Sequence, residues 1–357
     1  MESTQLPATP GSRVWGWLDD RLGIGGLRYP VPRHANSLAY TLGGITLVSF
    51  VLLVITGIYL AQFYDPTEAR AHISVTYITD TAFAGELIRS LHYWLATIFL
   101  VTLVLHMIRT FVTAAYKPPR EFIWITGILL FILAAGLLFS GTVLKQDQEA
   151  VEALDHNLEI AKIFGFLGFW FSSDFTNNIS VVTRLYIAHV SILPLIFATI
   201  IAVHMLLIKR HRISPLPWGT PSEVAARERE EHSETFTSHL AHIGKWALVL
   251  LGVAFLLAGL APAALGPAGV EGIEITKPPW YFLWLYPWEN WIGLQALYII
   301  PAILIGGLLA LPFVDRTPER DPRRRKLWIA LGLIVLLAWL ALTIYGHVTV
   351  PVHHVMD

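Results

Sequence analysis

The chain contains no cysteine. This absence excludes disulfide bonds, iron–sulfur ligation, thioether attachment of a cofactor and thiol catalysis together. Charge is also scarce, because only 14% of the 357 residues are charged whereas 55% are hydrophobic. A chain this apolar is not an ordinary soluble domain, so the composition indicates a membrane protein. The formal net charge of -1 gives no reason to expect nucleic acid as a partner.

Seven apolar stretches are long enough to cross a bilayer, which takes about 20 residues of helix. They are residues 38–64, 90–113, 122–144, 185–208, 246–265, 291–313 and 327–348. The sequence therefore predicts an all-α membrane protein with seven transmembrane helices. No long apolar run precedes Leu38, so no secretory signal is expected. The segment before it predicts an amphipathic helix lying on the membrane surface, with an apolar face of Val14, Trp17, Leu18 and Leu22.

Lysine and arginine are concentrated before the first predicted span and in every second connection after it. By the positive-inside rule the N-terminus then lies in the cytoplasm and the C-terminus outside. This is the arrangement expected for an integral protein of a prokaryotic inner (plasma) membrane. The basic triplet 323–325 is interpreted as part of this topology signal and nothing more.

The connections suggest how the chain is divided. Residues 213–242 are polar and charged, and predict a cytoplasmic linker between two parts of the protein. The first part, 1–212, contains the surface helix and a four-helix bundle, and the second, 243–357, contains three helices. Residues 145–183 and 266–290 are too long for simple turns, so we expect short helices there, folded over the outer surface.

Four histidines lie within the predicted spans: His92 and His106 in the second, His189 and His204 in the fourth. Positions 14 apart are about 40° apart around a helix and about 21 Å apart along it, and positions 15 apart are about 60° and 22 Å apart. Because both spans run in the same direction, the histidines form two pairs at two depths. A lone buried histidine is usually a hydrogen-bonded core residue, but two stacked pairs suit the axial ligands of two haem irons. Zinc would need four ligands, and no acidic residue lies at these depths.

Glycines in the first and third spans repeat the same spacing: Gly43 and Gly57 are 14 apart, as are Gly127 and Gly141. A glycine at each level removes the side chain, so that a flat macrocycle can approach the backbone. Glycine in transmembrane helices more often indicates close helix packing. The match to the histidine spacing in two further helices favours the haem interpretation.

Three arginines lie near the predicted membrane edges, close in sequence to these histidines: Arg89, Arg109 and Arg184. A guanidinium binds a carboxylate through two parallel hydrogen bonds, so each arginine could neutralise a haem propionate. The competing explanation is that these side chains simply extend from the membrane edge to water.

Several longer stretches match one known family. They are LGGITL at 42–47, LIRSLHYW at 87–94, LHMIRTF at 105–111, TRLYIAHVSILP at 183–194, HMLLIKRHRISP at 204–215 and KPPWYF at 277–282. Over nearly its whole length the chain resembles the cytochrome b subunit of quinol:cytochrome c oxidoreductase (cytochrome bc) complexes. The seven spans and the 15-residue histidine spacing resemble the chloroplast and cyanobacterial branch, as a fusion of its cytochrome b with its three-helix partner subunit.

The resemblance assigns an outer haem to His92 and His189 and an inner haem to His106 and His204. Both are b-type haems, bound without covalent attachment. The chloroplast branch holds an extra haem through a cysteine, but this sequence has Thr41 at that position, so no covalent haem is expected. An extra noncovalent haem there remains an open alternative.

The outer quinol site of the family usually contains a Pro-Glu-Trp-Tyr motif, whose carboxylate accepts a quinol proton. Here the motif is replaced by Pro278, Pro279, Trp280 and Tyr281, so the carboxylate is missing. Acidic residues occur instead in the connection after the third span and just before the motif. The candidates for the proton acceptor are Asp147, Glu149, Glu152 and Glu274, with Glu149 favoured. Acids in an outer loop are more often simply solvated, and a Pro-Pro turn could be merely rigid.

The resemblance implies that quinol is oxidised near the outer face. One electron leaves to a Rieske iron–sulfur protein and then to a cytochrome c-type carrier, and the other passes through the two stacked haems to an inner quinone site. Electron transfer is thereby coupled to proton translocation. The family also implies a homodimeric complex in contact with membrane lipid and quinone. Candidates for the inner site are Asp20, Lys209, Arg210 and His211.

Two other functions are possible from the histidines alone. A dihaem membrane anchor of a dehydrogenase or hydrogenase would leave the KPPWYF stretch and the three-helix part unexplained. A transporter that couples protons through buried histidines would predict repeats or broken helices at the midplane, whereas these histidines avoid the midplane. The terminal pair His353 and His354 could bind a metal, although exposed terminal histidines usually have no specific role.

Overall fold

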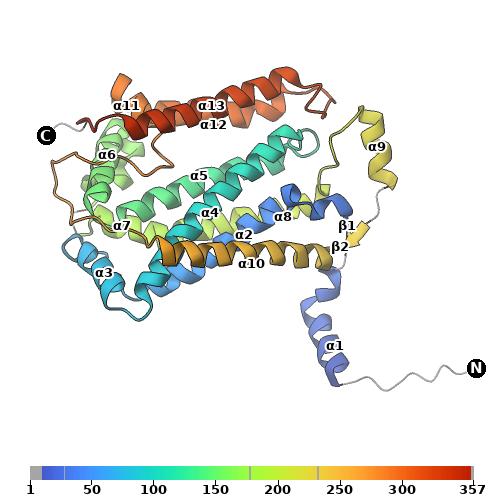
Figure 1. Cartoon of the computed structure of the whole chain (residues 1–357), viewed down its shortest axis with the longest axis horizontal. Coiled ribbons are helices and arrows are strands. Elements are labelled where there is room, and N and C mark those ends of the chain that lie inside the picture. The colour runs from blue at the N-terminus through green and yellow to red at the C-terminus, as the bar shows by residue number, and fades with distance from the viewer. Residues whose placement is uncertain (1–9, 28, 177, 231–232, 355–357) are drawn as a thin grey trace, which may run out of the picture.

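The computed structural model describes residues 10–27, 29–176, 178–230 and 233–354. Within these residues it contains seven helices long and apolar enough to cross a membrane, so the predicted number of spans is confirmed. Their long axes run side by side through the molecule (Figure 1). They are α2 (Leu38–Ala61), α4 (Gly85–Val112), α5 (Glu121–Val143), the continuous helix Val181–His211 that includes α7 and α8, α10 (Phe236–Leu260), α12 (Ala296–Val314) and α13 (Lys326–Val348).

Shorter elements lie at the two ends of this bundle (Figure 1). The end that we call the α6 end carries the C-terminal tail with α3 (Glu68–Asp80), α6 (Gln148–Phe164) and α11 (Tyr286–Ile292). The opposite end, the α9 end, carries α1 (Pro10–Leu22), α9 (Pro221–Glu230) and an antiparallel pair of strands, β1 (Pro30–Pro32) and β2 (Ser233–Thr235). Short 3-10 turns cover Ile24–Leu27, Arg33–Asn36, Gly165–Leu167, Phe169–Phe171 and Ser173–Phe175.

The fourth span changes its helical geometry around His189. α7 (Val181–Ile187) passes into a π-helical turn, Ala188–Ile192, before α8 (Leu193–His211) continues as α-helix. Pro194 has no N–H with which to bond the carbonyl four residues earlier, which favours a wider turn at this point. Because a π turn holds one residue more than an α turn, the 15-residue spacing of His189 and His204 places them much as a spacing of 14 would in an unbroken helix.

The core of the four-helix part is a layer of three aromatic rings. Phe50 from α2, Phe99 from α4 and Phe197 from α8 are buried together, with ring centroids 4.4 to 6.4 Å apart. Each lies roughly midway along its helix between the two levels of predicted haem residues. The layer therefore separates the two levels with apolar packing.

The fifth span starts earlier than the sequence predicted. α10 begins at Phe236 rather than near residue 246, within the predicted linker 213–242, and packs against α2 and α4. β2, just before α10, pairs with β1 near the N-terminus, and His239 Nδ1 lies 2.9 Å from the side-chain oxygen of Asn36. The end of the predicted linker, from β2 into α10, therefore packs against the N-terminal part of the protein.

The interpretation of the basic triplet as a topology signal alone is wrong for Arg325. Its side chain is buried and forms an ion pair of 2.9 Å with Asp315. Its neighbours Arg323 and Arg324 are much more exposed, as expected for residues that set topology. At the other end of the chain, Val14 and Trp17 of α1 are 58% and 55% exposed, which leaves an apolar surface as predicted for this helix.

Candidate functional site

At the level nearer the α6 end, His92 and His189 face each other across the bundle. Their ring centroids are 6.4 Å apart. A Cβ atom added at Gly57 would lie 3.3 Å from Cε1 of His92, and one added at Gly141 would lie 3.0 Å from Cε1 of His189. The two glycines therefore leave open the space beside the two rings.

The level nearer the α9 end repeats this arrangement with the other four residues. A Cβ at Gly43 would lie 2.9 Å from Cε1 of His106, and one at Gly127 would lie 3.6 Å from Cε1 of His204. Each of the four glycines singled out in the sequence thus faces one of the four histidines. Ordinary close packing of helices would not require a histidine opposite every glycine.

Hydroxyl groups that the sequence analysis overlooked orient three of the four imidazoles. The bonds join Thr56 Oγ1 to His92 Nδ1 (2.9 Å), Ser140 Oγ to His189 Nδ1 (3.0 Å) and Thr126 Oγ1 to His204 Nδ1 (2.8 Å). Each hydroxyl also donates to a backbone carbonyl of its own helix, so that it accepts the Nδ1 proton. The neutral imidazole then has its lone pair on Nε2, ready for a metal. The signal in the sequence is a serine or threonine directly before a glycine.

The fourth histidine lacks such a partner. Gly43 is preceded by Leu42, which has no hydroxyl, and Nδ1 of His106 is buried without a hydrogen bond. The two levels of the bundle are therefore chemically different: both imidazoles at the α6 end are hydrogen-bonded, but only one of the two at the α9 end is.

Two of the three predicted propionate-binding arginines contact the backbone at the α6 end. Arg89 donates to the carbonyls of Ala263 and Ala264 at 2.6 and 2.7 Å. Arg184 donates to two carbonyls in residues 170–172. Both guanidinium groups thus hold the connections that cover this end of the bundle.

Arg109, at the α9 end, is placed differently. Its guanidinium carbon lies 4.4 Å from the ring centroid of Tyr40, a cation–π contact, and its Nε is buried without a hydrogen bond. Lys209 Nζ lies 5.4 Å from the ring of Tyr29. Of the other candidates for an inner site, Asp20 and Arg210 are exposed and His211 is partly buried.

The predicted quinol-site turn, 278–281, lies against the end of the third span. The hydroxyl of Tyr281 is 2.8 Å from Oγ1 of Thr142, near the end of α5. Burial raises the pKa of Tyr281, and the negative charge of Glu149 raises it further, so Tyr281 stays protonated. The ring of Trp280 is 5.6 Å from that of Tyr281 and nearly perpendicular to it. The structure therefore brings the turn, the end of α5 and Glu149 together.

Two of the other candidate acids have structural partners. Asp147 is the N-cap of α6: one carboxylate oxygen accepts from the backbone N–H of Ala150, and the other from Gly266. Glu152 is 6% exposed and accepts from both the backbone N–H and the hydroxyl of Thr276. These acids attach α6 to the connection that leads into the 278–281 turn.

At the level nearer the α6 end, the distance between the two histidines fits two ligands of one haem iron. Two metal–nitrogen bonds of about 2 Å each, with about 1 Å from each nitrogen to its ring centre, require ring centres roughly 6 Å apart. The observed 6.4 Å matches this requirement. The four glycines and the oriented imidazoles also fit a haem. Thr41, which stands where the chloroplast branch has its haem-binding cysteine, is fully buried, and its hydroxyl donates to the carbonyl of Leu38.

Comparison with known proteins leads to the same family. Cytochrome b6 of Heliobacterium mobile is 36% identical over 208 residues, which are 56% of this chain and 98% of that protein. The cytochrome bc complex cytochrome b subunit of Chlorobaculum thiosulfatiphilum is 29% identical over 352 residues, 93% of this chain and 80% of that protein. A solved structure described as hyperthermophilic respiratory Complex III matches with a TM-score of 0.77 and 26% identity, over 94% of this chain and 91% of that chain. The family model described as Cytochrome b/b6/petB matches residues 27–212, which are more than half of this chain, and the chain therefore belongs to the cytochrome b/b6 family.

Proposed function

We propose that this chain is the cytochrome b subunit of a quinol:cytochrome c oxidoreductase, with a Rieske iron–sulfur protein and a cytochrome c-type subunit or carrier as partners. The observation that carries the proposal is that each of the four glycines faces one of the four histidines. The names of the relatives and the match over both parts of the chain support it. The distribution of basic residues supports an orientation in which the α6 end faces the outside.

Four histidines would hold two b-type haems in this proposal. His92 and His189 would bind the iron nearer the α6 end, and His106 and His204 the iron nearer the α9 end. When bound, the haems supply the one-electron redox chemistry that connects a quinol site at one end of the bundle with a quinone site at the other. The protein contributes oriented imidazoles, glycine surfaces and the apolar layer between the levels.

Arg109 is the best candidate among the arginines for a propionate. The Nε of both Arg109 and Arg184 is buried without a hydrogen bond, but the guanidinium of Arg109 contacts the ring of Tyr40 and none of the described hydrogen bonds engages it, so a propionate oxygen could accept from it. Arg89 and Arg184 already donate to backbone carbonyls, so their main role is to hold the connections that cover the α6 end of the bundle. Lys209, beside Tyr29, provides positive charge where the quinone would take up protons.

The quinol site is proposed between the end of α5 and the 278–281 turn. Pro278 and Pro279 restrict the backbone of the turn, and Trp280 and Tyr281 supply its aromatic surface. The hydroxyl of Tyr281, kept protonated by burial, can hydrogen-bond a quinol oxygen.

Glu149 is proposed to accept the quinol proton. Its carboxylate is paired with the side chain of Lys145 and lies close enough to Tyr281 for its negative charge to raise the pKa of that residue. Asp147, in contrast, caps a helix, and Glu152 is held by the backbone next to the turn. Glu149 is therefore the acid beside the turn that is bonded to a side chain rather than to the backbone, and Asp147 has the supporting role of fixing the start of α6.

Quinol turnover in a Glu149→Gln variant tests this assignment. Loss of a general base typically lowers the rate about 100-fold or more, and we expect such a loss with the haem content unchanged. The control is Glu159→Gln, on the same helix, where the acid forms an exposed pair with Lys162. Normal turnover and normal pH dependence in Glu149→Gln would remove Glu149 from the mechanism. A well-folded wild-type chain that binds no haem would overturn the function as a whole.

A further inference from the structure

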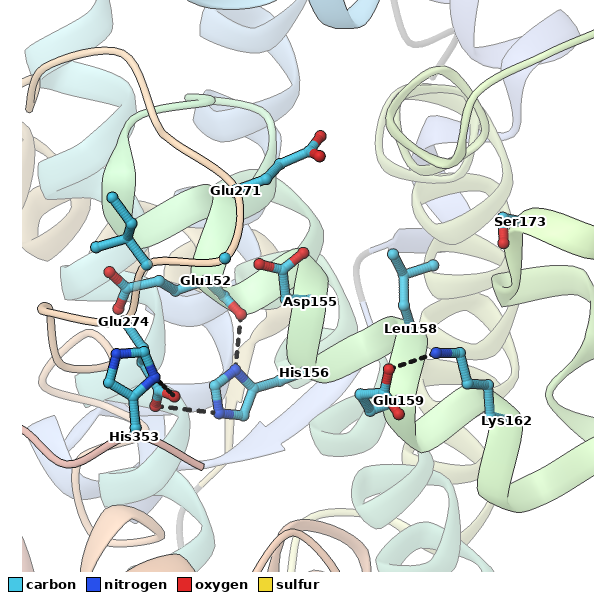
Figure 2. A pocket seen from close by; sticks show the side chains of 12 residues that line it. Glu152, Asp155, His156, Leu158, Glu159, Lys162, Ser173, Glu271, Glu274 and His353 are labelled. Atoms are coloured by element: carbon cyan, nitrogen blue, oxygen red, sulfur yellow. Dashed lines mark hydrogen bonds and ion pairs between the residues drawn. The ribbon is translucent and has the colours of Figure 1, made fainter. Parts of the chain in front are cut away.

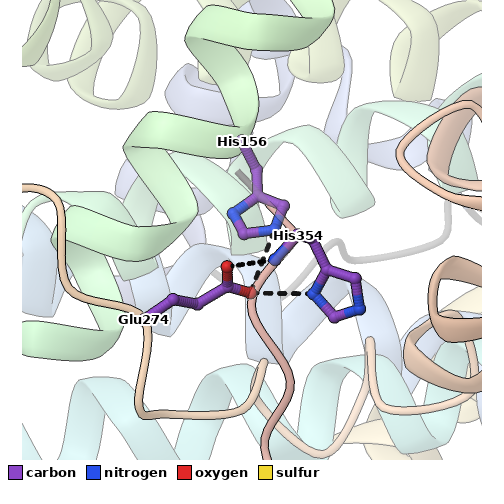
Figure 3. Close-up of side chains that lie close together, drawn as sticks. All are labelled: His156, Glu274 and His354. Atoms are coloured by element: carbon purple, nitrogen blue, oxygen red, sulfur yellow. Dashed lines mark hydrogen bonds and ion pairs between the residues drawn. The ribbon is translucent and has the colours of Figure 1, made fainter. Parts of the chain in front are cut away.

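A second group of histidines and acids lies at the α6 end of the molecule, and Figure 3 shows three of its members close together. His156 of α6, Glu274 and His354 of the C-terminal tail each place a nitrogen or oxygen atom within 4.8 Å of the other two. Glu289 of α11 adds a carboxylate, whose Oε1 lies 3.2 Å from Nε2 of His156. The side chain of His354 is only 6% exposed, so the expectation of an exposed terminal pair is wrong for this residue.

The ring of His156 has a defined orientation. Its Nδ1 lies 2.7 Å from the carbonyl oxygen of Glu152, which can only accept, so Nδ1 carries a proton. In the neutral ring the lone pair is then on Nε2. This atom faces two carboxylates, at 3.2 Å from Glu289 and 3.5 Å from Glu274.

The ring of His354 is oriented with the roles of its two nitrogens reversed. Its Nε2 lies 2.6 Å from the side-chain oxygen of Asn290, an acceptor, so the proton of the neutral ring is on Nε2. Nδ1 then carries the lone pair and lies 2.8 Å from Oε1 of Glu274. In both rings a nitrogen lone pair faces a carboxylate oxygen. Such contacts are stable only with a proton or a metal ion between the two atoms, so these groups hold either additional protons or one shared metal ion.

We propose that His156, His354, Glu274 and Glu289 bind one divalent transition-metal ion, with Zn²⁺ as the best match. Two imidazole nitrogens and two carboxylate oxygens form a four-ligand set that zinc takes at about 2.0 to 2.2 Å. A bond from the opposite ring nitrogen to a carbonyl oxygen, as in His156, is typical of metal-binding histidines. Ca²⁺ and Mg²⁺ are less suitable because they prefer ligands that are all oxygen.

An open cavity of about 260 Å³ leads to this site (Figure 2). His156 and Glu274 form part of its lining, together with the acids Glu152, Asp155, Glu159 and Glu271, with Lys162 and with the exposed His353. Acidic walls concentrate cations near the opening. The cavity therefore provides a path by which an ion can reach the four ligands.

The ion would connect segments that are distant in sequence. His156 comes from α6, Glu289 from α11 and His354 from the tail, and Glu274 lies just before the 278–281 turn. The tail is already bonded there, because the backbone N–H of Val352 donates to the hydroxyl of Tyr286 at 2.7 Å. A bound metal would add a cross-link between these segments, independently of whether the turn binds quinol.

Metal titration of the purified complex tests the site. The complex is stripped with a chelator and titrated with Zn²⁺ by calorimetry and with Co²⁺ by visible absorption. We expect one ion per chain and the intense d–d bands of a tetrahedral Co²⁺ site. His354→Gln and Glu274→Gln should each weaken binding at least tenfold, because even changes to the outer partners of a metal site cost about 10- to 100-fold.

The matched control is His353→Gln. This neighbouring ring is 61% exposed, and its nearest nitrogen is 3.8 Å from Glu274, so we expect it to bind Zn²⁺ as the wild type does. Haem absorbance and the unfolding temperature verify that each variant is folded. Failure of the folded wild-type complex to bind Zn²⁺ or Co²⁺ would overturn the proposal and leave two protonated histidines paired with acids. So would equal binding by the wild type, His354→Gln and Glu274→Gln.

Discussion

Nζ of Lys117 lies 2.8 Å from Oδ1 of Asp315, and both side chains are almost completely removed from solvent. The other carboxylate oxygen of Asp315 accepts from the hydroxyl of Tyr116 at 2.6 Å and from Arg325 at 2.9 Å. Lys117 lies in the connection between α4 and α5, whereas Asp315 directly follows α12. This buried cluster therefore attaches the three-helix part of the chain to the four-helix part at the α9 end.

Replacing Asp315 by asparagine should destabilise the protein. Removal of one partner from a buried ion pair leaves an uncompensated charge and typically costs about 3 to 5 kcal/mol. We expect a clearly lower temperature of thermal unfolding for the purified protein in detergent. The control is Arg70→Gln, which breaks a pair with Asp65 in which the arginine side chain is 70% exposed, and should leave that temperature unchanged. Equal temperatures for Asp315→Asn and the wild type would show that the cluster does not stabilise the fold.

The carboxyl group of Asp315 should make the stability of the protein depend on pH. Burial alone would raise the pKa of Asp315, but the bonds from Lys117 and Tyr116 and the charge of Arg325 outweigh it and hold this pKa below its usual value. A group with a lowered folded pKa stabilises the protein above its unfolded pKa, about 3.9, and loses this contribution as pH falls through the folded value. Unfolding temperatures measured from pH 6 to about pH 3 should fall more steeply for the wild type than for Asp315→Asn. Parallel curves would contradict this assignment.

Filling a glycine beside a histidine should remove one haem. A Cβ at Gly141 would lie 3.0 Å from the ring of His189, so Gly141→Val should block that level and reduce the haem content from two per chain to one. Gly136→Val is the control on the same helix, because a Cβ there meets only Leu193, at 3.8 Å. A pyridine haemochrome assay measures the content. Two haems in Gly141→Val would mean that this glycine is a packing residue.

The helices and the facing glycines and histidines could be predicted because each depends on a periodic pattern within one span. Apolar length defines a transmembrane helix, and a repeat of 14 residues places side chains at two depths of one face. The start of α10 at Phe236 could not be found in this way, because its first turns are polar and its position depends on the pairing of β2 with β1.

Side-chain partners from distant segments were also beyond the sequence. Arg325 resembles its exposed neighbours in the printed chain, and only packing against Asp315 distinguishes it. In the sequence His354 is an ordinary residue of the C-terminal tail, and only its contacts with Glu274 and Asn290 in the fold distinguish it. The π turn at His189 is an intermediate case, since Pro194 and the spacing of 15 together indicate it once the geometry is known.

The hydroxyl groups before the glycines should tune the redox potentials of the two levels. Ser140 accepts a hydrogen bond from His189, and this bond makes the imidazole a stronger donor to iron, which favours the oxidised state. The bond is worth about 1 kcal/mol and only the part that differs between the two oxidation states shifts the potential, so in Ser140→Ala the potential of the haem at the α6 end should rise by up to about 40 mV for a one-electron couple.

Leu42→Thr tests the same effect in the opposite direction at the other level. Leu42 precedes Gly43, whereas a serine or threonine precedes each of the other three glycines. Nδ1 of His106 is buried without a hydrogen-bond partner. A threonine there should donate to its own helix backbone and accept from His106, lowering the potential of the haem at the α9 end by a similar amount. Thr199→Ala on α8 is the control for both variants, because its hydroxyl bonds only the carbonyl of Leu195 among the described contacts. Redox titration followed by absorption measures both potentials. If Ser140→Ala and Leu42→Thr leave them unchanged, the hydroxyls orient the rings without tuning the iron.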